Sequence, residues 1–134
     1  MRWLAAVMTG TLALAACKPA DLPTAPDASM AGTYALRTMA GAVLPYAVLQ
    51  RPGFDLKVTS EAMRLEASGG FVDITSYVRV DGAVVDYPVD TLTGTWSAFQ
   101  TNVKLSAKGV TFSGTVVGST LTLNNGTLTS VYVK

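Results

Sequence analysis

The chain contains no histidine and only one cysteine among its 134 residues. Without histidine it lacks the commonest general base at neutral pH and the commonest protein ligand of transition metals. A single cysteine cannot form a disulfide within the chain, so packing and strand pairing must hold any folded domain together. We therefore expect no metal site, no cofactor and no disulfide framework.

Charged residues are also scarce, at 14% of the chain, and ten Lys plus Arg nearly balance nine Asp plus Glu. Binding to nucleic acid needs a basic excess that neutralises phosphates, so we expect no nucleic-acid partner. The length suits one domain with a modest core rather than two.

The first sixteen residues have the pattern of a secretory signal peptide. Arg2 precedes an uncharged, largely apolar run from Trp3 to Ala16 that ends in small residues. This run is shorter than the roughly 20 apolar residues that span a bilayer, which favours a cleaved signal over a permanent anchor.

The cysteine, Cys17, directly follows Leu14, Ala15 and Ala16. These four residues resemble the lipobox of bacterial lipoproteins. The resemblance implies cleavage before Cys17, acylation of its sulfur, and anchoring of the protein to a membrane by two or more acyl chains. In the alternative, Cys17 is a small apolar residue of an ordinary export signal that is cut elsewhere.

Lys18 follows the cysteine where inner-membrane lipoproteins usually have aspartate. This resembles lipoproteins sorted to the outer membrane, so we expect the periplasmic face of that membrane, or the cell membrane in an organism with one membrane. Residues 19–30 contain three prolines and show no apolar period, which predicts an extended tether. The predicted organisation is a signal peptide over 1–16, a lipidated cysteine with its tether over 17–30, and one domain over 31–134.

From Gly32 onward apolar residues recur with a period of two, interrupted every eight to twelve residues by Gly, Asn or Asp. This pattern predicts an all-β fold, an antiparallel up-and-down meander of eight to ten strands that forms a small barrel. The last forty residues predict four strands, with turns at 108–109 and 118–119 and a type I′ turn at Asn125 and Gly126.

Earlier strands are less regular. Residues 56–58 and 63–65 suggest two strands with a kink near Ser60, and a short helical turn fits within 43–50. Over 72–80 the alternation directs Val72 and Ile74 to the core and Asp73 and Thr75 to solvent. Apolar residues then move from odd positions (85–89) to even positions (92–98), which predicts a β-bulge at 90–91.

The triplet Gly32–Tyr34 resembles the Gly-x-Trp motif that opens lipocalins, with tyrosine in place of tryptophan. Lys134 stands where the lipocalin closing arginine would pack across this aromatic ring. Asp86 and Tyr87 match part of the lipocalin Thr-Asp-Tyr motif, with Val85 in place of threonine. The domain resembles small lipocalin-like domains of bacterial lipoproteins, which implies a barrel that binds a small apolar ligand.

Four aromatic residues lie on strand faces predicted to point inward, where they either line a ligand cavity or fill a solid core. They are Tyr34, Trp96, Phe112 and Tyr132.

The sequence offers few candidate catalytic groups. A serine or threonine nucleophile would lack a histidine to act as its base. Carboxylates could still support hydrolysis, and they are Glu61, Glu66, Asp73, Asp81, Asp86 and Asp90. The aspartates beside Gly82 and Pro88 are explained as ordinary turn residues. Asp81, Asp86 and Asp90 lack the alternate-residue spacing of ligands in a calcium-binding loop.

We therefore expect a noncatalytic, membrane-anchored envelope lipoprotein whose barrel binds a small apolar ligand or lipid. The alternative is an adaptor or inhibitor that binds another envelope protein through its outer surface or an edge strand. An internal cavity of about 300 Å³ or more favours the first, and a solid core favours the second.

Overall fold

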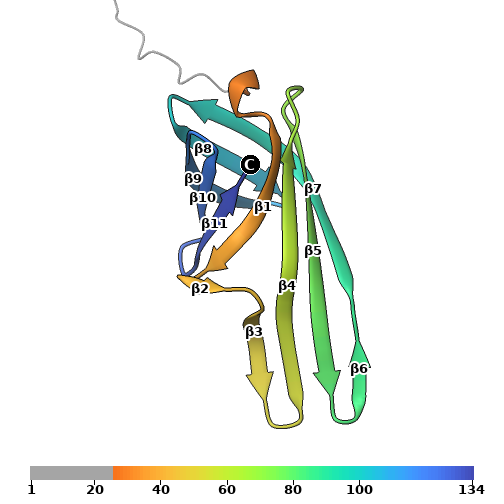
Figure 1. Cartoon of the computed structure of the whole chain (residues 1–134). Helices are drawn as coiled ribbons and strands as arrows, with labels where there is room; N and C mark the ends of the chain where they lie inside the picture. The colour runs from red at the N-terminus through yellow and green to blue at the C-terminus, as the bar shows by residue number, and fades with distance from the viewer. Residues whose placement is uncertain (1–25) are drawn as a thin grey trace, which may run out of the picture.

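The computed structural model describes residues 26–134, in which eight antiparallel strands close into a barrel (Figure 1). The barrel strands, in order around the sheet, are β1 (Gly32–Met39), β4 (Phe54–Leu65), β5 (Gly70–Asp81), β7 (Val89–Phe99), β8 (Asn102–Ala107), β9 (Val110–Val117), β10 (Thr120–Asn124) and β11 (Thr129–Val133). Pairing of β1 with both β11 and β4 closes the sheet. The predicted all-β meander and barrel are confirmed. Cys17, the lipobox and the predicted signal peptide, which we expect to be helical, lie outside the described residues.

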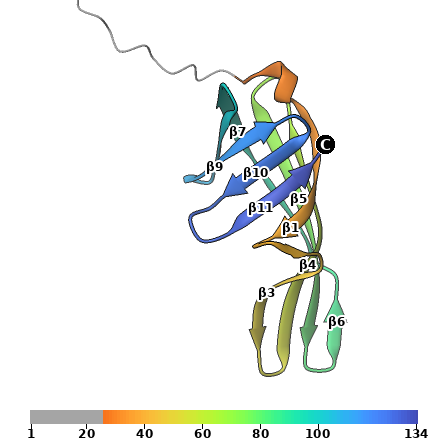
Figure 2. The same cartoon turned by 60° about the vertical axis from the view of Figure 1, so that its left-hand side comes forward.

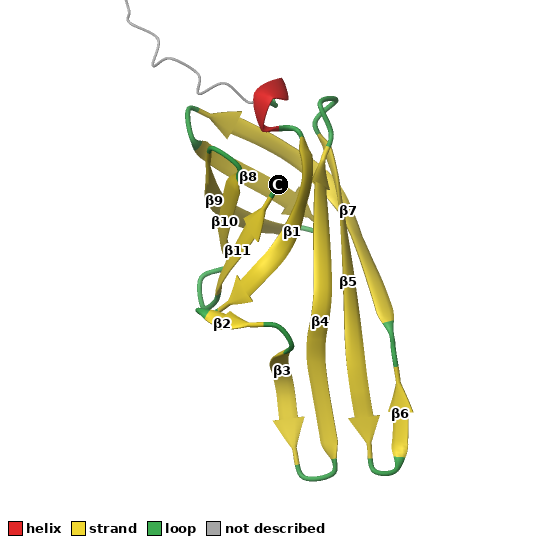
Figure 3. Cartoon of the chain, viewed as in Figure 1, coloured by secondary structure: helices red, strands yellow, loops and turns green. Residues whose placement is uncertain are grey.

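Three short strands lie outside the barrel: β2 (Ala42–Val43), β3 (Tyr46–Arg51) and β6 (Val84–Asp86). The helical turn predicted within 43–50 is wrong, because β2 and β3 occupy this segment. Helical structure in the described part of the chain is confined to the 3₁₀ turn η1 (Ala28–Met30), drawn red in Figure 3. Within residues 26–134 no helix has the length and apolar character needed to cross a membrane.

Strands β4 and β5 each have twelve residues and extend beyond one end of the barrel. There β3 pairs with Phe54–Val58 of β4, and β6 pairs with Arg79–Asp81 of β5. Together β3, β4, β5 and β6 form a sheet here, which Figure 2 shows projecting from the barrel. We call β3, β6 and the segments 54–58 and 77–81 the arm.

A register shift between Val58 and Ser60 interrupts the pairing of β4 with β5. The two strands predicted over 56–65 are therefore one strand with a bulge, next to the predicted kink at Ser60. An extra residue bends a strand without ending it and moves the following residues to the opposite face. Val58 and Met63 are consequently both buried, although one is at an even position and the other at an odd one.

The bulge predicted at 90–91 is wrong, because β7 pairs with β5 in unbroken register from Val89 to Thr95. Tyr87 and Pro88, between β6 and β7, stay beside β5 in the same register, and the Pro88 carbonyl accepts a 2.9 Å hydrogen bond from the N–H of Tyr77. Pro88 has no N–H to donate to a ladder. Val85 and Val89 are more than half exposed, so they do not share the core with the even-numbered residues of β7.

The face assigned to β5 is also wrong. Phe71 and Thr75 are buried, whereas Ile74 is 45% exposed. The inward face therefore consists of the odd-numbered residues 71–77, and Asp73 belongs to it. The sequence alternation predicts the wrong face because two of the inward residues, Asp73 and Thr75, are polar, and both line the cavity described below.

The end of the barrel opposite the arm is closed by packed side chains around Tyr34 and Trp96, which are 0% and 3% exposed. The Tyr34 hydroxyl donates a hydrogen bond of 2.7 Å to the carbonyl of Met30. The Lys134 ammonium lies 5.6 Å from the centre of the Tyr34 ring, the packing that the lipocalin resemblance implies. Met30, in the segment assigned to the tether, is buried in the same core.

The predicted turns of the C-terminal meander are confirmed at 108–109 and 118–119, which separate β8, β9 and β10. The type I′ turn at 125–126 is wrong, because it requires positive φ at both residues and only Gly126 has it. A four-residue loop joins β10 to β11 instead. The Asn125 side chain accepts hydrogen bonds from the N–H groups of Thr127 and Leu128 and so replaces the tighter turn.

Candidate ligand-binding site

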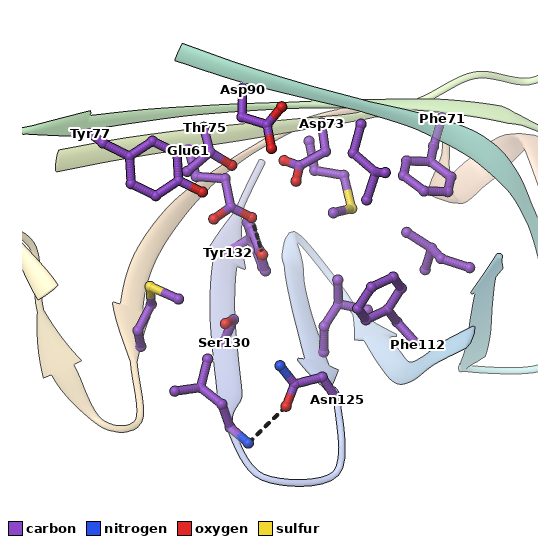
Figure 4. Close-up of a pocket in the computed structure, with 16 residues that line it drawn as sticks. Glu61, Phe71, Asp73, Thr75, Tyr77, Asp90, Phe112, Asn125, Ser130 and Tyr132 are labelled. Atoms are coloured by element: carbon purple, nitrogen blue, oxygen red, sulfur yellow. Dashed lines mark hydrogen bonds between the residues drawn. The ribbon is translucent and has the colours of Figure 1, made fainter. Parts of the chain in front are cut away.

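A cavity of about 310 Å³ lies inside the barrel, towards the end from which the arm projects (Figure 4). Its lining includes the exposed residues Asp90 and Asn125 at that end, where the cavity opens. The inner part is apolar and is lined mainly by Met63, Phe71, Leu92, Leu105, Phe112 and Leu123. The cavity therefore has an open polar mouth and an apolar inner end.

Strand register explains the change from polar to apolar lining. Strands β4, β5 and β7 are neighbours, so their paired residues form rows across the inner face of the barrel. From the mouth inward, three successive rows are Glu61, Thr75 and Asp90, then Met63, Asp73 and Leu92, then Leu65, Phe71 and Gly94. Polar character decreases from three residues to one and then to none.

Tyr132 projects from β11 across the barrel, and its hydroxyl donates a hydrogen bond to the Glu61 carboxylate. Burial raises the pKa of Glu61, and the hydrogen bond from Tyr132 partly opposes this shift. Burial and the nearby charge of Glu61 also raise the pKa of Tyr132 well above its usual value. Tyr132 thus keeps its proton at neutral pH and acts as a donor.

Asp73 is the most strongly perturbed acid of the cavity. Burial, together with the charges of Glu61 and Asp90, raises the pKa of its carboxyl to about 8. Its Oδ1 atom is buried without a hydrogen-bond partner. Asp73 is consequently mostly protonated at pH 7.

The four predicted aromatic candidates divide between the two roles left open by the sequence. Phe112 and Tyr132 line the cavity, whereas Tyr34 and Trp96 lie in the packed end of the barrel and do not. The Trp96 indole N–H donates a 2.8 Å hydrogen bond to the carbonyl of Glu66, as expected for a buried tryptophan.

Sequence reasoning considered Glu61, Asp73 and Asp90 as carboxylates but did not bring them together. The structure places all three on one wall of the cavity. Phe71 was the residue that could have indicated this arrangement. It is a large apolar residue at an odd position of β5, and if it faces inward, Asp73 at the next odd position faces inward too. Within residues 26–134 no group of three or more acidic or cysteine side chains is arranged to hold a metal ion.

Comparisons with protein-family models, with curated proteins and with solved structures give no match for this chain. Its function must therefore be inferred from the cavity and the residues around it.

Proposed function

We propose that this protein is a noncatalytic, lipid-anchored envelope lipoprotein whose barrel binds a small apolar ligand or part of a lipid. The observation that carries the proposal is the cavity of about 310 Å³ with an apolar inner end. Sites for small molecules have volumes of about 300–1,000 Å³ and are lined mainly by apolar side chains. This cavity is at the lower end of that range, so we expect a small ligand or a single chain of a lipid.

In the described part of the chain, Tyr34 and Trp96 are packed at the far end of the barrel, whereas the cavity opens between the arm and the β10–β11 loop. We expect the ligand to enter there. Apolar surface that moves from water into such a site stabilises the complex by about 25 cal/mol per Å². The walls belong to one closed sheet, which favours a site formed before the ligand arrives.

Binding can be tested with N-phenyl-1-naphthylamine, an apolar dye whose fluorescence rises in apolar surroundings. We expect saturable binding of one dye per chain. Leu92→Trp places an indole in the cavity and should weaken dye binding at least about tenfold, a loss of about 1.4 kcal/mol. Thr93→Trp is the matched control, because Thr93 is the adjacent exposed residue of β7 and does not line the cavity.

Equal dye binding by both tryptophan variants would place the dye outside the cavity and contradict the proposal. Circular dichroism of each variant shows whether it has kept the fold.

The anchor part of the proposal is supported by the lipobox resemblance at residues 14–17. Cells that express the full chain and are labelled with radioactive palmitate should incorporate label into the protein. Cys17→Ser removes the sulfur that would carry the acyl group, so this variant should lose the label and be released from the membrane fraction. Label retained on the variant would exclude lipidation at Cys17.

The arm favours a second candidate function, an adaptor that binds an envelope protein through an edge strand. In the described part of the chain, β3 pairs only with β4 and β6 only with β5, so each leaves one edge free. Val84 and Val85 on β6 are more than half exposed. A partner strand can add to such an edge through main-chain hydrogen bonds. Absence of dye binding by the unmodified chain would favour this candidate over the first.

A further inference from the structure

Three carboxyl groups form one wall of the cavity near its mouth. Glu61, Asp73 and Asp90 come from the neighbouring strands β4, β5 and β7. Figure 4 shows their side chains directed into the same part of the cavity, with Phe112 on the opposite side. We call these three residues the acidic wall.

The acidic wall has no positive partner in the described structure. Neither lysine nor arginine is among the described residues that line the cavity. The ion pairs found within residues 26–134 use other carboxylates, those of Asp55, Glu66 and Asp86. The negative charge that the wall carries when ionised is therefore not neutralised by the protein.

The wall also has unused capacity to accept hydrogen bonds. Glu61 accepts from the Tyr132 hydroxyl and Asp90 from the N–H of Thr91. Glu61 also shares a hydrogen bond with the Asp73 carboxyl. An ionised carboxylate can accept about four hydrogen bonds, so the wall can still accept further ones. Asp73 Oδ1 is buried without any donor, an arrangement that destabilises the empty site and favours a ligand that supplies one.

We propose, on the basis of the proposed function, that the ligand is an amphipathic amine whose ammonium group binds the acidic wall while its apolar body fills the inner end. An ammonium group supplies three N–H donors and a positive charge. An alcohol supplies one donor and no charge, and an anion would be repelled. The apolar residues begin one row inside the carboxyls, at Met63 and Leu92, so the two ends of the site match the two ends of such a molecule.

Proton release should accompany binding of an amine. The titratable groups around Asp73 are Glu61 from β4, Tyr77 from β5, Asp90 from β7 and Tyr132 from β11. With the cavity empty, burial and the charge of Glu61 hold the pKa of Asp73 at about 8. A bound ammonium favours the ionised carboxylate and displaces this proton. Since alkylamines stay protonated to about pH 10, affinity should rise between pH 6 and pH 8.5.

The test compares n-octylamine with n-octanol, which has the same apolar chain and no charge, by isothermal titration calorimetry of the full chain. We expect octylamine to bind at least about tenfold more tightly than octanol at pH 7.5. Calorimetry in buffers of different ionisation enthalpy should show that octylamine releases up to about one proton. Asp73→Asn should weaken octylamine at least about fivefold and change octanol less than about twofold. Asp81→Asn, on the exposed tip of β5, is the charge-matched control and should change neither.

Octanol binding as tightly as octylamine, or equal effects of Asp73→Asn and Asp81→Asn, would overturn the amine proposal and leave the apolar cavity as the proposed binding site. If neither compound binds, both the amine proposal and the proposed function are wrong.

Discussion

Replacing Trp96 with alanine is expected to lower the free energy of unfolding by about 3–5 kcal/mol, the usual range for a large aromatic lost from a core. Trp96 is 3% exposed, packs at the closed end of the barrel and donates a hydrogen bond to the Glu66 carbonyl. The variant loses both the packing and the hydrogen bond. Chemical denaturation followed by circular dichroism measures the change.

Phe99→Ala is the matched control, because Phe99 is an aromatic residue of the same strand that is 39% exposed. We expect this change to lower the free energy of unfolding by less than about 1 kcal/mol. A loss below about 1 kcal/mol for Trp96→Ala as well would show that Trp96 is not a core residue. Dye binding by Trp96→Ala, measured where the variant is folded, should change little, because Trp96 does not line the cavity.

The unmodified protein should become less stable as pH rises from 4 to 8. Asp73 has a folded-state pKa of about 8 against a usual value of 3.8, because it is buried beside Glu61. Between these values the unfolded chain releases the proton while the folded chain retains it, so ionisation favours unfolding. At about 1.4 kcal/mol per pKa unit, reduced by solvent near the mouth, we expect a loss of about 2–5 kcal/mol. Glu61, whose pKa burial also raises, adds to the loss in the same direction.

Asp73→Asn removes the ionisable group and should flatten most of this dependence, making the variant more stable than the unmodified protein at pH 8. The chain contains no histidine, so no imidazole titrates in this interval and obscures the result. Asp81→Asn should follow the unmodified curve. A stability that is constant or rises from pH 4 to pH 8 would show that Asp73 is not buried as the structure places it.

Much of the barrel could be predicted from the sequence because most strands carry a single alternation of buried and exposed residues. In β8 the buried residues Val103, Leu105 and Ala107 alternate with exposed polar ones, and this pattern permits one orientation. The pattern became ambiguous where a strand left the barrel. Val84 and Val85 of β6 are apolar like core residues but belong to the arm, where both are more than half exposed in the described part of the chain.

The cavity could not be predicted for a related reason. Hydrophobic alternation assumes that the inside of a barrel is apolar, and Asp73 and Thr75 violate this assumption on β5. Likewise, Glu61 faces inward only because of the bulge after Val58, which the sequence suggested only as a kink. The acidic wall depends on the register of three strands, which cannot be deduced from any one of them.

The claim that the barrel cavity binds an apolar ligand is tested most directly by the methionine methyl groups. Met39 and Met63 line the cavity, whereas Met30 lies in the packed core and does not. The full chain, labelled with ¹³C at its methionine methyls, would be titrated with N-phenyl-1-naphthylamine and followed by NMR, since the aromatic rings of the dye shift nearby methyl resonances. We predict saturable shifts of Met39 and Met63 with Met30 unchanged. Dye binding that leaves Met39 and Met63 unshifted, or moves Met30 as much as either, would contradict a binding site in the cavity.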